Sequence, residues 1–312
     1  MWQAEATARR NYMSIEWNEQ RLARLKELCL VGCGNIEISE TLETEFSQPV
    51  SVKSVEQAKY RNRFTRFSMV ENFDVPIFKS ETLPDDNYMI SCDYHSPYHS
   101  PLWINRYLAI AELFKIRKSI VIGDLFDMEF AKKWYSPNMK SLDDEAEEAQ
   151  PVIQALDYFD ENVLICGNHE SRPGRMTDGK IQAKHLYHLF GKEIWDKKFK
   201  YTEYDKMWIG DKWLLVHPRS YSQISPSVAK RLAEKFHCNI INSHGHLIGM
   251  TYDRSGRYLA IDLGGMFDIQ RIEYINMNTT THPVWGCGFG ALFEGHFWHF
   301  HKATDWKFWG LA

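Results

Sequence analysis

From residue 87 to about residue 265, the sequence repeats one pattern, a short apolar run that ends in a polar cluster. The segments that follow it are YMISCDYH, SIVIGDLFD, NVLICGNHE, WLLVHP, NIINSHGH and RYLAIDLGG. Apolar runs of this length between polar residues predict buried strands, and helical stretches such as residues 101–116 separate the first of them. Strands that alternate with helices predict an α/β layered domain whose functional groups gather at the carboxyl ends of the strands.

Each of the first five segments ends in carboxylate, imidazole or amide side chains. These are Asp93 and His95, Asp124 and Asp127, Asn168 and His169, His217, and His244 and His246. A lone histidine at a strand end is usually structural, but recurrence in five clusters argues against that reading for all of them. Without thiolates, such ligands suit hard to borderline divalent cations, and there are enough for two ions. Because alternate strand positions face the same way, we expect Asp93 and His95 to grip one ion.

The order D-x-H, GD-x-x-D, GNH-E, H and H-x-H resembles the motifs of the calcineurin-like metallophosphoesterases, a superfamily of phosphatases, cyclic-nucleotide phosphodiesterases and nucleases. The resemblance implies a layered β-sandwich flanked by helices over residues 87–312. It also implies one metal held by Asp93, His95 and His246, a second held by Asn168, His217 and His244, and Asp124 as the bridge between them. His169 would be the catalytic histidine, with Asp127 orienting it.

The implied cofactors are two divalent metal ions, with Mn²⁺ preferred over Fe, Zn, Ni or Co. Two ions about 3.5–4 Å apart can hold and acidify a water that attacks phosphorus in line, while His169 protonates the leaving oxygen. The sequence departs from the family pattern at Ser243, where glycine is common. It also lacks the arginine that follows the GD-x-x-D motif in Ser/Thr phosphatases, which argues against a protein phosphatase.

Other charged segments near the motifs have two readings. Arg172 and Arg175 follow the GNHE motif and are candidates to bind substrate phosphate, because arginine forks suit phosphate oxygens; a solvated loop is the alternative. The acidic run at 141–151 predicts a solvated helix start rather than a metal site. The aromatic tail with His296, His299 and His301 predicts closing strands whose histidines are surface or packing residues.

Residues 1–66 predict a separate all-α module. Helical patterns over 18–31, 36–46 and 52–64, with a glycine break after the first, outline a helix-turn-helix, and residues 67–86 predict a linker. The third helix is basic, and its candidate nucleic-acid contacts are Lys53, Lys59, Arg61 and Arg63. An ordinary three-helix cap, for example one that mediates oligomerisation, is the alternative.

Charge and hydropathy narrow the partners. The formal net charge is −4 and the pI is near 6.4, so no global field recruits nucleic acid or an anionic membrane. The first thirty residues lack the apolar stretch of a signal peptide and no segment is long enough to span a bilayer, so we expect a cytoplasmic protein. HPVWGCGF, GGMFD and the module order also resemble phage and prophage phosphoesterases.

These observations favour a two-metal phosphoesterase that hydrolyses phosphodiester or phosphomonoester bonds. A nuclease is the preferred interpretation because the basic third helix would then have a purpose, which is to bring the enzyme to nucleic acid. The catalytic motifs do not separate nuclease, phosphatase and nucleotide phosphodiesterase. The alternative is a DNA-binding protein whose phosphoesterase scaffold is catalytically idle; its signature would be a missing ligand position, and none of the positions is missing.

Overall fold

The computed structural model describes residues 16–31, 33–62, 64, 81–133, 138–190, 192–272 and 284–311, except for the side chains of 192–194. The chain divides into two compact units, Met1–Phe78 and Lys79–Ala312, which are described one at a time. In the described residues, no helix is long and apolar enough to cross a membrane.

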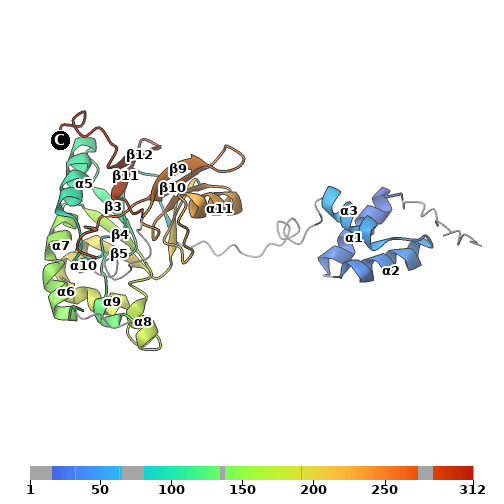
Figure 1. The fold of residues 1–312 in the computed structure, drawn as a ribbon, viewed down its shortest axis with the longest axis horizontal. Helices are drawn as coiled ribbons and strands as arrows, with labels where there is room; N and C mark the ends of the chain where they lie inside the picture. Colours follow the sequence, from blue (N-terminus) through green and yellow to red (C-terminus); the bar gives the residue numbers. More distant parts are fainter. Residues whose placement is uncertain are drawn as a thin grey trace, which may run out of the picture. The chain divides into compact units, whose positions relative to one another are not determined.

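The first unit holds three helices around a small apolar core. They are α1 (Glu19–Leu30), α2 (Asn35–Phe46) and α3 (Val52–Arg61) (Figure 1). The side chains of Asn18 and Ser51 cap α1 and α3 by accepting a backbone N–H three residues on. Leu25, Leu42 and Val55 are fully buried between the helices, which explains the helical spacing of apolar residues in this stretch. A nucleic-acid role for this unit stays a prediction, as do the domain boundaries.

The second unit is built on two six-stranded sheets. One has the order β1 (Thr82–Leu83), β6 (Lys206–Ile209), β7 (Trp213–Val216), β8 (Asn239–Asn242), β10 (Leu259–Leu263), β9 (Ile248–Tyr252). The other has the order β12 (His296–His301), β11 (Gly288–Phe293), β2 (Tyr88–Ser91), β3 (Lys118–Ile122), β4 (Glu161–Ile165), β5 (Phe199–Thr202). Strands β2 to β5 run parallel, as do β7, β8 and β10.

Alternate residues of the strands explain how the layers stack. In β3, Ile120 and Ile122 belong to the apolar cluster shared by the two sheets, whereas Val121 belongs to the cluster on the helix side. A strand buried on both faces reads as a continuous apolar run, which is why this segment shows no alternation. The predicted layered β-sandwich flanked by helices is therefore confirmed, and the tail forms the closing strands β11 and β12.

Helices cover the outer faces of the sheets. On the sheet that contains β3 these are α5 (Pro101–Phe114), α6 (Leu142–Glu148) and α7 (Gln150–Leu156), and the other sheet is covered by α11 (Ser227–Phe236) (Figure 1). The connections that surround the site carry η2 (Glu129–Ala131), α8 (Arg172–Met176), α9 (Ala183–Leu186), η3 (Tyr187–Phe190) and α10 (Lys192–Lys198). Phe126 stacks on Phe190 with ring centroids 4.0 Å apart, which anchors the loop after β3.

The acidic run at 141–151 differs from expectation at one residue. Ser141 and Asp144 form the capping box that starts α6, as solvated helix-start residues do. Glu145, however, is fully buried, and its carboxylate accepts the backbone N–H groups of Met128 (2.6 Å) and Glu129 (2.9 Å). One acid of the run thus holds the loop that follows Asp127, because buried N–H groups need an acceptor.

Candidate metal centre

The polar clusters predicted at five strand ends converge at one edge of the sandwich. They follow β2, β3 and β4 in one sheet and β7 and β8 in the other, and these strands are parallel within each sheet. Carboxyl ends of parallel neighbours meet at the same edge, and stacking two such sheets brings the two sets of loops together. The clusters therefore face one another across the top of the apolar core.

The reason that Asp93 and His95 lie together is not the one expected. Strand β2 ends at Ser91, so both residues lie beyond the strand rather than on alternate positions of it. Their φ angles are +49° and +46°, in the left-handed region. Asp124, His244 and His246 share this conformation, with φ of +50°, +70° and +54°. Non-glycine residues adopt it rarely and at a cost, so the loops aim these side chains through strained backbone.

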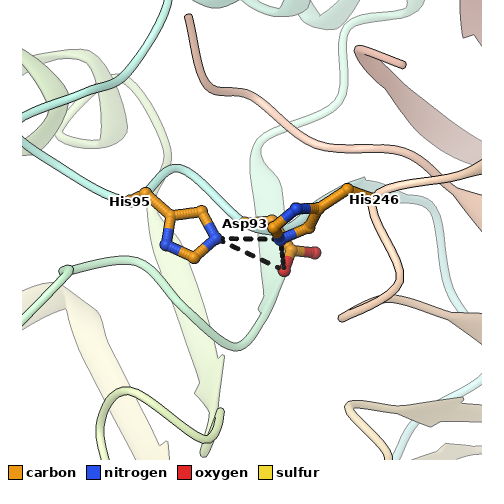
Figure 2. A group of neighbouring side chains, drawn as sticks. All are labelled: Asp93, His95 and His246. Atoms are coloured by element: carbon orange, nitrogen blue, oxygen red, sulfur yellow. Dashed lines mark hydrogen bonds and ion pairs between the residues drawn. The ribbon is translucent and has the colours of Figure 1, made fainter. Parts of the chain in front are cut away.

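Asp93, His95 and His246 form a first group, and all three are buried (Figure 2). His246 Nε2 lies 3.1 Å from Asp93 Oδ1 and 2.9 Å from His95 Nε2. His95 Nδ1 lies 2.9 Å from a carboxylate oxygen of Asp127, which places its proton on Nδ1 and turns the Nε2 lone pair toward the centre. Donor atoms gathered at these distances are close enough to one another to hold a cation.

Asp124, His217 and His244 form the second group. His217 Nε2 lies 3.3 Å from Asp124 Oδ2 and 2.9 Å from Asn168 Oδ1. The same Asp124 oxygen lies 3.9 Å from His95 Nε2, so it faces both groups. This is the position that the resemblance assigns to a bridging carboxylate.

Two buried oxygens show that the residues fit divalent ions. Asp93 Oδ1 and Asp124 Oδ2 point into the centre and accept no hydrogen bond from any described residue. A buried acceptor without a partner costs about 1–3 kcal/mol, and a cation bound between the two groups would satisfy both oxygens. The ligand roles remain a proposal, but the donor set suits two ions held by oxygen and imidazole nitrogen.

Charges in the centre compensate one another. Burial opposes ionisation of Asp124, yet His169 and His217 hold its pKa well below the usual range. Burial likewise disfavours a charged His217, but the carboxylate of Asp124 raises its pKa to about 10. Burial and the neighbouring His217 lower the pKa of His244 to about 4. A proton on His217 thus balances carboxylate charge, and a cation would bind in exchange for it.

His169 and Asp127 lie beside the two groups. His169 Nδ1 is 2.8 Å from Asp127 Oδ1, the geometry expected of an oriented catalytic histidine. His169 Nε2 is 3.8 Å from Asp124 Oδ2 and 2.7 Å from Arg172 Nη2. The guanidinium of Arg172 also donates to the carbonyl of Asp127. In this arrangement the guanidinium of Arg172 contacts Nε2 of His169, the nitrogen that would have to face a leaving group if His169 were the proposed acid.

The remaining predicted residues are placed as follows. Arg175 Nη2 donates to the carbonyl oxygen of Asn168 (2.7 Å), which holds it beside the second group. In the other unit, Lys53 and Arg61 are exposed on α3, and Lys59 Nζ donates to Asn35 Oδ1 (2.8 Å). Arg63 lies outside the described residues.

Sequence reasoning gave no role to Glu170, the last letter of GNHE. Its buried carboxylate accepts the N–H groups of Asp124 (2.9 Å), Leu125 (2.8 Å) and Gly167 (2.9 Å). Burial, with Asp124 nearby, raises its pKa to about 7. The two loops are packed so closely here that a Cβ on Gly167 would lie 2.2 Å from Asp124 Oδ1. The sequence signal that could have identified Glu170 is its place as a charged residue shortly after a buried strand.

Ser243 and Lys132 were also missed. Ser243, noted only as a departure from glycine, donates to the carbonyl of Ile122 (2.9 Å) and lies 2.9 Å from His217 Nδ1. Lys132 Nζ lies 2.7 Å from Asp127 Oδ2. The first residue orients a proposed ligand, and the second supplies a positive charge next to the motif that lacks the phosphatase arginine.

Comparison with known proteins gives limited support. No family model matches the sequence, and no curated protein matches it. Among solved structures, it is similar to Yfce, a phosphoesterase from E. coli, with 13% identity, 67% of this chain and 88% of that chain covered, and a TM-score of 0.35. It is similar to the Pseudomonas putida nuclease MPE with 12% identity, 68% and 86% covered, and a TM-score of 0.28.

A dimetal phosphatase from Danio rerio is also similar, with 11% identity, 70% and 96% covered, and a TM-score of 0.33. Two stacked sheets that gather carboxylate and imidazole groups at their strand ends are the arrangement that the resemblance to the calcineurin-like metallophosphoesterases implies. The substrate does not follow from the fold.

Proposed function

We propose that the protein hydrolyses phosphate esters, with phosphodiesters, including nucleic acid, as the preferred substrates. The observation that carries the proposal is the pair of groups that Asp124 Oδ2 faces, in which two buried carboxylate oxygens accept no hydrogen bond from a described residue. Two bound divalent ions would polarise the phosphoryl oxygens and acidify the attacking water. Oxygen and nitrogen ligands without thiolate suit Mn²⁺, which we propose as the activating ion.

The protein's own residues would handle the protons. The oxygen of water forms a bond to phosphorus, and the bond from phosphorus to the leaving oxygen breaks. His169, held by Asp127, donates the proton that the leaving oxygen takes up. One proton of the water restores His169, and the other is released to solvent, so the step balances.

The basic helix α3 supports the preference for nucleic acid. Lys53 and Arg61 are exposed on it, and Tyr60 has 82% of its surface exposed. Cations and an exposed aromatic ring on one short helix are the side chains that contact phosphates and bases. The competing function, a DNA-binding protein with an idle scaffold, is separated from this one by a single test of turnover.

The test is hydrolysis of bis-p-nitrophenyl phosphate and p-nitrophenyl phosphate by metal-stripped protein resupplied with Mn²⁺. Asp124→Asn is the test variant, because asparagine keeps the acceptor for the His169 N–H (2.9 Å) but loses the charge of the bridging position. Asp211→Asn, in an exposed turn, is the matched control.

We expect Mn²⁺-dependent turnover of the diester that is abolished in Asp124→Asn and retained in Asp211→Asn. Turnover of the monoester alone would contradict the proposed phosphodiesterase and indicate a phosphatase instead. No turnover of either compound would leave the idle scaffold as the function of this domain. Full activity of Asp124→Asn would contradict the proposed role of Asp124 as the bridging ligand.

A further inference from the structure

A pocket of about 470 Å³ opens beside the second ligand group. One wall is formed by Asn168, His217 and His244, which are proposed ligands, so whatever lies in this pocket adjoins the phosphorus under attack. The volume is within the range of sites that enclose a small ligand, roughly 300–1,000 Å³. A phosphoryl group occupies only a small part of such a space, and the remainder must hold another part of the substrate.

The lining of the same pocket includes two arginines, Arg175 and Arg219. Arg219 is exposed, lies two residues after His217, and has no ion-pair or hydrogen-bond partner within the part of the chain that the structure describes. Arg175 is fixed by one nitrogen to the carbonyl of Asn168, which leaves other donors of its fork available. A fork next to a phosphate-ester centre is suited to a second phosphate.

Two acidic residues, Glu203 and Asp205, also line the pocket and limit where an anion can lie. Glu203 forms an ion pair with Lys184, so its charge is compensated. Asp205 also lines the pocket, and its backbone carbonyl accepts the N–H of His217 (2.8 Å), which fixes its position. A second phosphate is therefore favoured on the arginine side and disfavoured near the carboxylate of Asp205.

Tyr204 adds an aromatic ring to the same pocket. Its backbone carbonyl accepts the N–H of Cys166 (3.1 Å), and the residue is 45% exposed. A tyrosine in a pocket that also contains the proposed ligands and two arginines is suited to stack on a nucleobase, an interaction that does not depend on the base. Phosphate, base and second phosphate would then follow one another along the pocket.

We infer that this pocket is a subsite for a second phosphate one nucleoside away from the scissile one, bound by Arg175 and Arg219 with the base on Tyr204. The inference rests on the proposed phosphodiesterase function and sharpens it. The substrate is a nucleotide strand or a bisphosphorylated nucleoside, and an isolated small diester is a poor substitute.

The test compares two substrates that differ by one phosphate. These are the p-nitrophenyl ester of thymidine 5′-phosphate and the same ester that carries a 3′-phosphate, together with the corresponding pair of opposite polarity. With the full chain and Mn²⁺, we expect kcat/KM to be higher by about tenfold for the two-phosphate member of one pair, the effect of a charge-assisted hydrogen bond to arginine.

Variants assign that preference to the pocket. Arg219→Gln is expected to raise KM for the two-phosphate substrate and to bring the ratio of the two kcat/KM values close to one. Asp205→Asn is expected to raise the ratio, because it removes the opposing charge. Arg254→Gln, an exposed arginine on the hairpin between β9 and β10, is the control and should leave the ratio unchanged.

Equal kcat/KM values within both pairs, or an unchanged preference in Arg219→Gln, would contradict the proposed subsite. Neither result would contradict the proposed phosphodiesterase activity. If neither ester is hydrolysed, the proposed function fails, and calorimetry still decides the subsite. Thymidine 3′,5′-bisphosphate should then bind the unmodified protein more tightly than thymidine 5′-phosphate does. The two nucleotides should bind Arg219→Gln with equal affinity. Equal binding to the unmodified protein would exclude the subsite.

Discussion

At the scale of single residues, Asp127 connects both halves of the proposed chemistry. Its Oδ1 lies 2.9 Å from His95 Nδ1 and 2.8 Å from His169 Nδ1, and its Oδ2 lies 2.7 Å from Lys132 Nζ. Burial works against the charge, but His169 and His95 hold the pKa of this carboxyl well below its usual range. One carboxylate thus fixes the tautomer of a proposed ligand and of the proposed acid, leaving Nε2 of each directed inward.

For His169, we expect replacement by glutamine to lower kcat by about 10²–10⁴ and to leave the bound metal unchanged, because we propose that its imidazole transfers a proton. The measurement of metal matters because His169 also lies, with His95 and Asp127, in a group whose atoms are close enough to hold an ion. Mn²⁺-dependent turnover and metal content by mass spectrometry measure the two effects. His296→Gln, an exposed histidine, is the control. Loss of metal in His169→Gln would show that a ligand has been mistaken for the acid.

The residues that the sequence identified are those whose type is set by the chemistry. Aspartate and histidine after buried strands stand out because no packing reason explains them. Glu170 shares this signal, but its role could not be predicted, and neither could the roles of Ser243 and Lys132. These side chains contact backbone groups or other side chains of the site, in one case across 121 residues. Their partners exist only once the loops have folded together.

At the scale of elements, the strands were predictable and the loops were not. Buried strands are recognised by apolar runs, so β2, β3, β4, β7 and β8 fall where the sequence places them. The expectation that strand alternation aligns Asp93 with His95 was wrong, because β2 ends two residues before Asp93. Strand length depends on pairing with β3 and β11, which a single sequence does not specify.

The hairpin between β9 and β10 depends on one carboxylate. Asp253 is 8% exposed and accepts N–H groups from Ser255, Arg257 and Tyr258. Burial opposes its ionisation, but these hydrogen bonds, together with the hydroxyl of Ser255, lower its pKa from the ordinary 3.8. The unfolded chain therefore binds the proton more readily, and the hairpin loses stability as the pH falls below about 4.

We expect Asp253→Asn to melt at a lower temperature than the unmodified protein at pH 7. The difference should shrink as the pH falls, because protonation removes the negative charge of Asp253 from the unmodified protein, and the variant already lacks that charge. Melting curves between pH 7 and pH 3 measure it, with the exposed Asp211→Asn as the control. A difference that stays constant with pH would mean that the charge of Asp253 does not stabilise the hairpin.

At the scale of the whole molecule, the chain joins a three-helix unit to a much larger two-sheet unit. Each has its own apolar core, so the roles of the two units can be tested independently. The order of the units was readable from the change of sequence pattern after residue 66. The partner of the first unit could not be predicted from the sequence, because exposed basic residues form the same pattern whether they bind phosphate or only water.

If α3 binds DNA, Lys53→Ala combined with Arg61→Ala should weaken binding and reduce the slope of its salt dependence by roughly 0.9 for each phosphate that the helix no longer neutralises. Turnover of bis-p-nitrophenyl phosphate should not change. Lys59 is left in place because it donates to Asn35. Lys26→Ala with Lys302→Ala removes the same charge elsewhere on exposed positions as the control. Unchanged DNA affinity in the α3 variant would favour an oligomerisation cap.

The left-handed backbone at five proposed ligands has a consequence for the stability of the folded chain. Each such residue strains the folded chain by about 1–2 kcal/mol, a strain that glycine does not feel. In the metal-free protein, His244→Gly should therefore unfold at a higher temperature than His244→Ala, although both lose the imidazole; φ at this position is +70°. On stability alone glycine would be favoured at these positions, so the aspartate and histidine side chains that this chain carries there oppose the stability of the fold.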